Sequence, residues 1–572
     1  MSTAQQPDGE VSVRSVLEDL QQSYRRMEMP MRTYLLAVVL PAVLFAVGSV
    51  AAALLVSLPI TVAGPLVGLG AFSVFAALLY PKAVQDRSRK QIRQRFHLFL
   101  THITVLSMTN INRVEIFRTL AGEDEYQALA DEMGHLVALV DTWNQSLDDA
   151  CRMRANQVNS DLLSDFLERL AYTVGSGQQI SEFLMDEQDS IIQQFVIRYE
   201  ADLNKLDVMK ELYLSMMLST AFVLVFAIVI PVIVGIDPTL AVGAVIGLFV
   251  IVQAGFVYAV HTISPHDPLW YREPESLTYP LAHVKARLAL GIGLSVVTSA
   301  AVAVVLLGYA PVATDVLPLP VMVALPVTPL IIPGWSVRKE ERRVQVRDEE
   351  FPSFVRALGA VESVKQSSTG SVLESLRKKD FGALTKNIDN LYKRLHMRID
   401  TNRSWHLFAA ETGSFLIQKF GDMYVEGRRM GGEPKVLGQV ISRNHSQVMK
   451  VREQRKQATT TLIGVLYGLT AASVFAFFVG LETVEMMIDI MDDMGDLGRM
   501  SFLISTEGYD LQVIEFLLLL TVLLNALLSS VMVRVSDRGH QVSGYVHFVA
   551  LTWTGALTAV VTRMVVDALI TV

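Results

Sequence analysis

The sequence is short of cysteine and of charge. It has 572 residues, yet Cys151 is its single cysteine and only 19% of its residues are charged. One cysteine excludes an intramolecular disulfide, a cysteine-ligated cluster and a CxxC redox pair. Soluble domains carry about 25% charged residues, so the composition favours membrane spans joined to polar segments. The net charge of −8 has the wrong sign for a protein that binds nucleic acid.

The short motifs that carry common enzyme chemistry are missing as well. The sequence has no GxxxxGK(S/T) phosphate loop, no HExxH and no GxSxG. It also has no cysteine and histidine spacing that suits a metal ion. The sequence therefore offers no candidate catalytic residues, no cofactor-binding residues and no metal site.

Long apolar runs are abundant. A helix needs about 20 apolar residues to cross a bilayer, because lipid cannot satisfy an open backbone. The sequence contains nine candidates: Tyr34–Val56, Val62–Tyr80, Tyr213–Gly235, Leu240–Val260, Leu288–Gly308, Leu317–Trp335, Leu462–Val484, Leu511–Val533 and Tyr545–Ile570. The sixth holds five prolines between Pro318 and Pro333. It is kinked, re-entrant or short, and an ordinary kinked helix is favoured.

Short basic clusters set the orientation of these spans. With nine spans, every such cluster falls on the side of the membrane that holds the N-terminus. The acidic residues between Glu485 and Asp496 fall on the other side. Because loops rich in Lys and Arg stay in the cytoplasm, we expect a multi-pass cell-membrane protein, surrounded by lipid, with a cytoplasmic N-terminus.

Few polar or ionisable residues lie within the spans. In the last span, Arg563 and Asp567 are four residues apart and can pair on one helix face. Glu515 and Asn525 in the eighth span are predicted to make hydrogen bonds to neighbouring helices. A proton-coupled transporter needs more charge at the middle of the membrane than this.

Two polar segments, 81–212 and 337–459, are too long to be loops. Each begins with an apolar stripe at helical spacing. The two stripes are related by a constant offset of 255 residues and consist of Phe96, Phe99, Leu100, Ile103 and Leu106 in the first segment and Phe351, Phe354, Val355, Leu358 and Val361 in the second. Further matches, such as Ser160 with Ser414, follow in the same order. The sequence therefore predicts an internal duplication.

The resulting prediction is an all-α polytopic membrane protein with about nine transmembrane helices and two homologous cytoplasmic helical-bundle domains. The expected layout is a cytoplasmic N-terminal segment (1–33), spans one and two (34–80), the first helical domain (81–212), spans three to six (213–336), the second helical domain (337–459), and spans seven to nine with the acidic external loop (460–572).

The two helical domains differ in charge. The first holds 14 Lys and Arg against 21 Asp and Glu, a balance of −7, whereas the second holds 24 against 15, a balance of +9. Either these are solvated helix faces, or the domains present opposite potentials to a partner or to each other across a dimer. The better candidates for contact with an acidic partner are the basic residues Arg377, Lys378, Lys379, Lys393, Arg394, Arg428 and Arg429.

The helices Phe96–Leu120 and Phe351–Leu376, and the glycine breaks at Gly175/Gly177 and Gly431/Gly432, carry a family resemblance. They resemble the type II secretion F domain, the repeated domain of membrane platform proteins in type IV pilus-like machines. The layout of about nine spans is similar to archaeal members, above all archaellum assembly platform proteins. One departure is Asn110-Ile111-Asn112, which stands roughly where the second copy has Gly370.

The resemblance implies that the protein is not an enzyme, and it implies a function and a set of partners. A platform protein lies under a filament and over a hexameric secretion ATPase on the cytoplasmic side. It passes ATP-driven motion to its spans, which add pilin-like subunits to the filament, and an archaellum would also rotate. The absence of a phosphate loop fits this division of labour. The basic second domain is then the expected docking site for the ATPase, and the duplication invites a homodimer.

Other readings remain open at this stage. An archaeal adhesion pilus would use the same kind of platform. A transporter or permease would suit nine spans and a duplication, but transporter repeats usually lie in the spans themselves, whereas this repeat is clearest in the polar helices. An intramembrane enzyme would need paired catalytic groups at the middle of the membrane, which we do not find.

Overall fold

A computed structural model describes residues 39–55, 88–234, 237–265, 267–271, 284–306, 317–365, 369–493 and 510–570, together with Tyr34, Val74 and Ala77. All regular structure among these residues is helical, apart from one isolated bridge between Trp270 and Ser414. The predicted all-α fold is therefore confirmed. The segment 1–33, most of the second predicted span and the loop 494–509 lie outside the described residues.

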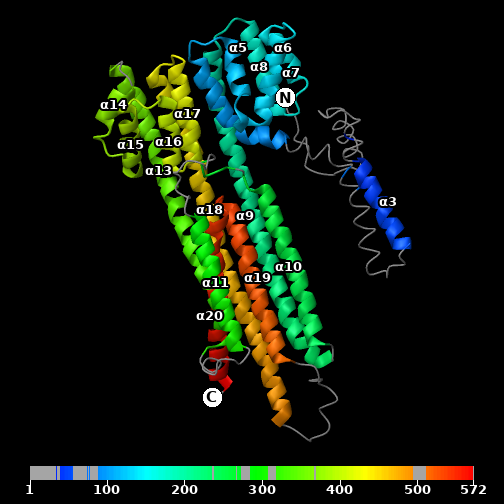
Figure 1. Ribbon diagram of the computed structural model, residues 1–572. Coiled ribbons are helices and arrows are strands. Elements are labelled where there is room, and N and C mark those ends of the chain that lie inside the picture. Colours follow the sequence, from blue (N-terminus) through cyan, green and yellow to red (C-terminus); the bar gives the residue numbers. More distant parts are fainter. Residues whose placement is uncertain are drawn as a thin grey trace, which may run out of the picture. The chain divides into compact units, whose positions relative to one another are not determined.

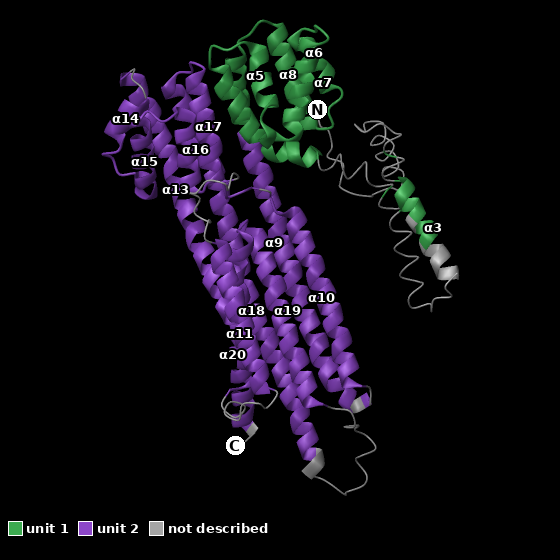
Figure 2. Cartoon of the chain, in the orientation of Figure 1, with its two compact units in different colours: residues 1–190 green, residues 191–572 purple. Residues whose placement is uncertain are grey.

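The chain divides into two compact units, residues 1–190 and 191–572 (Figure 2). The first unit contains α3 (Leu40–Leu55) and a bundle of short helices. The bundle consists of a helix over residues 88–107, α5 (Arg113–Ala121), η2 (Asp124–Tyr126), α6 (Ala128–Asp141), α7 (Leu147–Ala155), α8 (Asp161–Gly175) and the beginning of α9 (Ile180–Val234).

The second unit contains another bundle and most of the apolar helices (Figure 1). This second bundle consists of α13 (Ile331–Lys365), α14 (Thr369–Leu376), η4 (Gly382–Leu384), α15 (Thr385–His396), α16 (Thr401–Thr412), α17 (Phe415–Arg429) and the first part of α18 (Pro434–Asp493). Within this unit, α18 is one unbroken helix of 60 residues that runs from the bundle into the apolar helices. We use the names first bundle and second bundle for these two sets of helices.

The two bundles follow the same order of elements. Each has a long helix, a short helix, a 3₁₀ turn, three helices and a long helix that becomes apolar. The positions with positive φ repeat too: Gln127 with Gly382, Asn144 with Arg398, and Gly177 with Gly431, at offsets of 254 or 255. Left-handed backbone is uncommon for side chains other than Gly, so its recurrence at three matched turns shows that the same chain path is built twice.

The predicted apolar stripes form the interiors of the bundles. Phe99, Leu100 and Ile103 of the first bundle have no exposed surface, and the same holds for Phe354 and Leu358 of the second. Aromatic side chains add edge contacts, since Phe99 meets Tyr126 at 5.7 Å and Phe354 meets Phe381 at 5.6 Å between ring centroids. Helical spacing in the sequence therefore located both cores.

Seven described helices are long and apolar enough to cross a membrane. They are Ile180–Val232, Pro238–Ile263, Val284–Leu306, Leu319–Lys365, Pro434–Ile490, Leu511–Asp537 and Gln541–Leu569. These helices contain the predicted spans three to nine. The first predicted span appears as the 16-residue α3, and the second lies almost wholly outside the described residues. The count of nine is therefore not confirmed.

The proline-rich sixth span is an irregular but continuous helix. It begins as α12 (Leu319–Ala324), tightens to 3₁₀ geometry in η3 (Leu325–Leu330) and continues as α13. Prolines remove backbone donors and disturb the α-helical hydrogen bonds, which accounts for the local change of geometry. The favoured kinked-helix interpretation agrees with this. Its apolar part ends at Trp335, and that of α18 begins at Leu462, so residues 337–459 lie outside the membrane-spanning stretches.

The spans of the second unit pack around shared apolar clusters. The larger cluster joins α9, α10 (Pro238–Ile263), α18, α19 (Leu511–Asp537) and α20 (Tyr545–Ile570), and it includes Leu224, Val242, Leu481 and Leu518. In contrast, only 6% of the apolar window of α11 (Val284–Leu306) is buried. An apolar helix with so little buried surface is suited to contact with lipid.

Candidate functional site

Five of the seven predicted docking residues lie just after α14 or on α15, and four of them are exposed. Arg377 and Lys393 share Asp389, at 3.6 Å and 2.6 Å, and Arg377 also lies over the ring of Tyr392 at 4.7 Å. The hydrogen bond from Lys393 lowers the pKa of Asp389. Lys378 and Lys379 are exposed beside them. The structure therefore gathers an exposed basic surface here, which we name the α14–α15 surface after Arg377, Lys378, Lys379 and Lys393.

The other three predicted docking residues are arranged differently. Arg394 is mostly buried and forms an ion pair with Glu411. Arg428 donates to the carbonyl of Gly432 at 2.7 Å and to the buried Glu362 at 3.2 Å. Arg429 remains 61% exposed. Arg394 and Arg428 therefore stabilise the bundle, so only five of the seven residues present a largely accessible cation.

A buried ion-pair cluster lies where the second bundle joins the apolar helices, and it was not anticipated from the sequence. Arg452 of α18 donates to both carboxylate oxygens of Asp267, at 2.8 Å and 2.6 Å. Its third nitrogen donates to Asp348 of α13 at 2.8 Å. Arg538, at the end of α19, also pairs with Asp267. The side chains of Arg452 and Asp348 are 2% and 0% exposed, so one arginine joins three parts of the chain away from water.

Arg455 extends this cluster one turn further along α18. It donates to the carbonyl oxygens of Ser536 and Val535, at the end of α19, at 2.6 Å and 3.1 Å. It also donates to Pro265 and to the hydroxyl of Ser264, just after α10, both at 2.8 Å. Arginine provides five donors in a rigid fork, and here they satisfy the carbonyl groups where two helices end. We name Arg452, Arg455, Arg538, Asp267 and Asp348 the junction.

The buried charges of the junction shift the pKa values of the groups beside them. Burial alone would raise the pKa of Asp267, but the charges of Arg452 and Arg538 outweigh it and hold that pKa below its usual value. Burial raises the pKa of Asp348 to about 6, because Arg452 opposes it only in part. Burial and the charge of Arg452 lower the pKa of the neighbouring His445 to about 3. At neutral pH the carboxylates are therefore charged and the imidazole is neutral.

The sequence held only a weak signal for the junction. Arg452 and Arg455 belong to the basic cluster with Lys450 and Lys456 that precedes the seventh span, and such clusters usually mark orientation. Asp267 lies 185 residues earlier, and no local spacing links it to α18. Two arginines three residues apart share one helix face, and that spacing was the one available hint.

A second polar network lies among the spans. Gln253 of α10 donates to the side-chain oxygen of Asn525 of α19 at 2.6 Å and to the hydroxyl of Tyr213 of α9 at 2.9 Å. Asn525 donates in turn to Thr470 of α18 at 3.1 Å. Gln253 thus contacts Asn525 and the preceding helix α9, and Asn525 contacts Gln253 and the preceding helix α18. The hydrogen bonds predicted for Asn525 are confirmed.

The last span also carries a charged contact. Arg563 of α20 donates to Glu482 of α18 at 2.8 Å and to Glu515 of α19 at 3.3 Å. The interhelical bond predicted for Glu515 is therefore confirmed, with Arg563 as its partner. Among the residues that the structure describes, no group of three His, Cys, Asp or Glu side chains is arranged to hold a metal ion.

Together these features define a class: a multi-pass helical membrane protein in which a buried junction fastens a polar helical bundle to its spans. Comparison with known proteins makes the class more specific. The family Type II secretion system (T2SS), protein F, matches residues 99–228. This match covers most of the first bundle and continues through the apolar part of α9. No solved structure matches the chain.

Two relatives match almost the whole chain. Flagella accessory protein J of Methanocaldococcus jannaschii is 32% identical over 546 residues, which is 95% of this chain and 96% of the relative. Flagella accessory protein J of Methanococcus voltae is 31% identical over 561 residues, 95% of this chain and 98% of the relative. The chain therefore belongs to the Flagella accessory protein J family, a group of assembly platform proteins of archaellum and type IV pilus-like machines. The family resemblance seen in the sequence is confirmed.

Proposed function

We propose that this platform protein couples a hexameric secretion ATPase to the assembly, and possible rotation, of an archaellum built from pilin-like subunits. In this proposal the N-terminus and both bundles face the cytoplasm, and the domains keep the boundaries expected from the sequence. The protein acts without catalytic residues of its own. Support for an archaellum, as opposed to an adhesion pilus, comes from relatives named for flagella that match 95% of the chain.

The ATPase docks on the second bundle. The segment 337–459 carries a net charge of +9. The α14–α15 surface and Arg429 present the accessible cations of this segment. Complementary charge steers association and selects partners. The first bundle, with a balance of −7 over 81–212, would repel the same acidic partner. The duplication of the bundle is also the reason to expect a homodimer.

Motion then passes along α18 into the membrane. This helix is the observation that carries the proposal, because its 60 residues belong to the bundle at one end and to the spans at the other. Arg452 and Arg455 fasten it to α13, to the end of α19 and to the residues after α10. A displacement of the bundle is thereby carried to several spans at once, where pilin-like subunits contact the membrane part of the protein.

The docking surface is tested by charge reversal. Replacing Lys378, Lys379 and Arg429 by Glu should abolish binding of the purified ATPase to the full-length protein in lipid nanodiscs. Arg428 is left unchanged because it pairs with the buried Glu362. The matched control reverses two exposed cations of the first segment, Arg152 and Lys205, and should bind normally. Unchanged binding of the triple variant would refute this docking site.

The choice of filament is tested in cells. A deletion strain should lose its swimming filaments while adhesion pili remain, as seen by electron microscopy together with a swimming assay. Loss of pili alone would transfer the assignment to the adhesion system. Retention of both filaments would refute the platform role.

A further inference from the structure

One face of α13 changes from apolar to basic where the helix leaves the spans. The helix continues from the apolar helices into the second bundle (Figure 1). Its outward face includes Ile332, Trp335, Lys339 and Arg342, which follow one another at spacings of three, four and three residues and are all exposed. Residues at these spacings lie on the same side of a helix. They therefore form one continuous stripe, which we name the α13 face.

The rise of the helix places the two cations at the depth of lipid headgroups. Lys339 and Arg342 lie about 6 Å and about 10 Å beyond Trp335 along the helix axis, at about 1.5 Å per residue. The headgroup layer on each side of a bilayer is about 5–7 Å thick. Trp335 is 59% exposed and occupies the usual position of an aromatic residue at the membrane border. Both long side chains can therefore reach the headgroups.

The direction of α13 also turns these cations towards the membrane. Side chains on a helix tilt towards its N-terminus, and the N-terminal end of α13 is its apolar end. Lys339 and Arg342 therefore lean back towards Trp335. The long helices α9 and α18 run the other way, because their apolar part is the C-terminal part. Cations just before those spans, such as Lys205 and Lys456, lean away from the membrane.

The charge of the α13 face is not neutralised by the chain itself. Lys339 and Arg342 form no ion pair with any residue that the structure describes. The two carboxylates between them in the sequence are already engaged. Glu340 pairs with Arg343 at 2.8 Å, and Glu341 accepts a backbone hydrogen bond at 2.6 Å from the loop before α20. Both cations of the face are therefore available to an external anion.

Cations near the other long helices differ in this respect. Lys205 of α9 pairs with Asp202 at 2.9 Å, and Lys456 of α18 pairs with Glu453 at 3.4 Å. These lysines are 62% and 53% exposed. Exposure alone therefore does not distinguish the α13 face, whereas the lack of an internal partner and the tilt towards the membrane do.

The neighbouring helix shows what surrounds this part of α13. α11 packs against it where Gly291 meets the ring of Pro333, and only 6% of the apolar window of α11 is buried. Such a helix is suited to contact with lipid, so lipid chains lie beside the apolar end of α13 as well. α11 begins with two further exposed cations, Lys285 and Arg287, which add to the positive potential at the same membrane border.

The sequence repeats part of this pattern in the first copy. The positions 255 residues before Trp335 and Arg342 hold Tyr80 and Arg87, whereas Val84 stands in place of Lys339. An aromatic residue followed by one cation is thus common to both copies. The second cation, one turn nearer the membrane, belongs to the second copy at this position.

We propose that the α13 face binds the phosphate headgroup of an anionic phospholipid. Lys339 and Arg342 contact the phosphate, while Trp335 and Ile332 lie along the lipid chains. Binding holds α13 at a fixed depth in the membrane, at the point where the second bundle begins. The inference is independent of the partner that docks on this bundle.

The first test measures lipid affinity. Native mass spectrometry of the full-length protein in neutral detergent follows the binding of added phosphatidylglycerol. Replacing Lys339 and Arg342 together by Gln should weaken binding about fivefold for each cation removed. The matched control replaces Lys205 and Lys456 by Gln, which removes the same charge, and should bind as the wild type does. Equal affinities for the two double variants would overturn the proposal. Thermal unfolding curves check that both are folded.

A second measurement locates the lipid on the protein. Bromine atoms on lipid chains quench tryptophan fluorescence on contact, and Trp335→Phe identifies the part of the signal that comes from Trp335. In nanodiscs, brominated phosphatidylglycerol should quench this part more strongly than brominated phosphatidylcholine at the same fraction. The double Gln variant should lose the difference. Equal quenching by the two lipids in the wild-type protein would mean that α13 has no headgroup site.

Inorganic phosphate distinguishes a lipid from a free anion. Because the lipid chains contribute contacts with Trp335 and Ile332, added phosphate should leave the bound phosphatidylglycerol in place in the mass spectra. Displacement of the lipid by phosphate at comparable concentration would show a site for free anions and would overturn the assignment to a lipid.

Discussion

The two bundles share a framework but differ in the chemistry placed on it. Phe99 and Phe354 are equally buried at matched positions, and the three matched turns have the same sign of φ. At other matched positions the residues diverge. Arg93 is exposed in the first bundle, whereas Asp348 at the same place in the second is fully buried in the junction. Apolar spacing thus specifies the same fold twice, whereas polar residues at matched positions give the two bundles different surfaces and ion pairs.

The largest expected effect comes from breaking the junction of the second bundle. Replacing Arg452 by Met leaves Asp267 paired with Arg538 alone and removes the ion pair of the buried Asp348. Removing one partner of a buried ion pair costs about 3–5 kcal/mol, so the free energy of unfolding in mild denaturing detergent should fall by that amount.

A matched control for this change lies four residues further along α18. Lys456 is 53% exposed and pairs with Glu453 at 3.4 Å. Replacing Lys456 by Met should cost less than about 1 kcal/mol, because exposed ion pairs contribute little. Equal losses for the two variants would contradict the role given to the junction.

The second prediction tests the shared framework. Phe99→Ala and Phe354→Ala should each destabilise the protein by about 3–5 kcal/mol, because both side chains are fully buried. Proteolysis of the folded protein should show that each change loosens its own bundle. A large effect in one bundle and none in the other would show that the two cores are not equivalent.

The third prediction concerns the spans that follow the bundles. Gln253 and Asn525 contact each other at 2.6 Å, within the membrane. A double-mutant cycle with Gln253→Leu and Asn525→Leu should give a coupling free energy of about 0.6 kcal/mol, the average found for hydrogen bonds between membrane helices. Additive effects of the two changes would mean that the amides act independently.

The fourth prediction distinguishes two matched helix caps. The hydroxyl of Ser414 accepts from the backbone N–H of Ile417 at 3.1 Å and donates to Asp348, whereas Ser160 makes no side-chain cap bond. Replacing Ser414 by Ala should cost about 1–2 kcal/mol. Ser160→Ala should cost a few tenths at most. Thermal unfolding of both variants measures the difference, and equal shifts would refute it.

Much of the fold could be predicted from residue spacing. Helical periodicity located both cores, and apolar length located spans three to nine. These signals are local, because a helix buries residues that are three or four positions apart. The interhelical bonds of Glu515 and Asn525 were also predictable, since polar groups in lipid must find partners.

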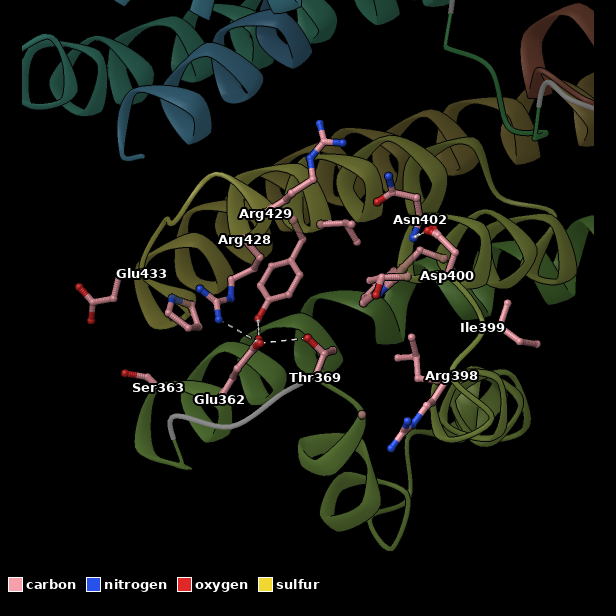
Figure 3. A pocket seen from close by; sticks show the side chains of 17 residues that line it. Glu362, Ser363, Thr369, Arg398, Ile399, Asp400, Asn402, Arg428, Arg429 and Glu433 are labelled. Carbon is pink, nitrogen blue, oxygen red and sulfur yellow. Dashed lines mark hydrogen bonds and ion pairs between the residues drawn. The ribbon is translucent and has the colours of Figure 1, made fainter. Parts of the chain in front are cut away.

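The functional details were harder to predict because they depend on distant residues. Charged residues on a helix usually face solvent, so nothing in the sequence marked Arg452 as buried or Arg394 and Arg428 as ion-paired inside the bundle. The pairing of Arg452 with Asp267 closes a gap of 185 residues. A cavity in the second bundle is lined by residues from α13 to α18, and no local pattern brings them together (Figure 3). Such features require the folded chain.

The most direct test of the central claim is filament assembly in a deletion strain. The strain carries either the chain with Lys378, Lys379 and Arg429 replaced by Glu or the control with Arg152 and Lys205 replaced. Electron microscopy counts the filaments, and immunoblots of the membrane fraction confirm equal protein levels. The account predicts filaments with the control and none with the triple variant. Normal filament numbers with the triple variant would contradict it.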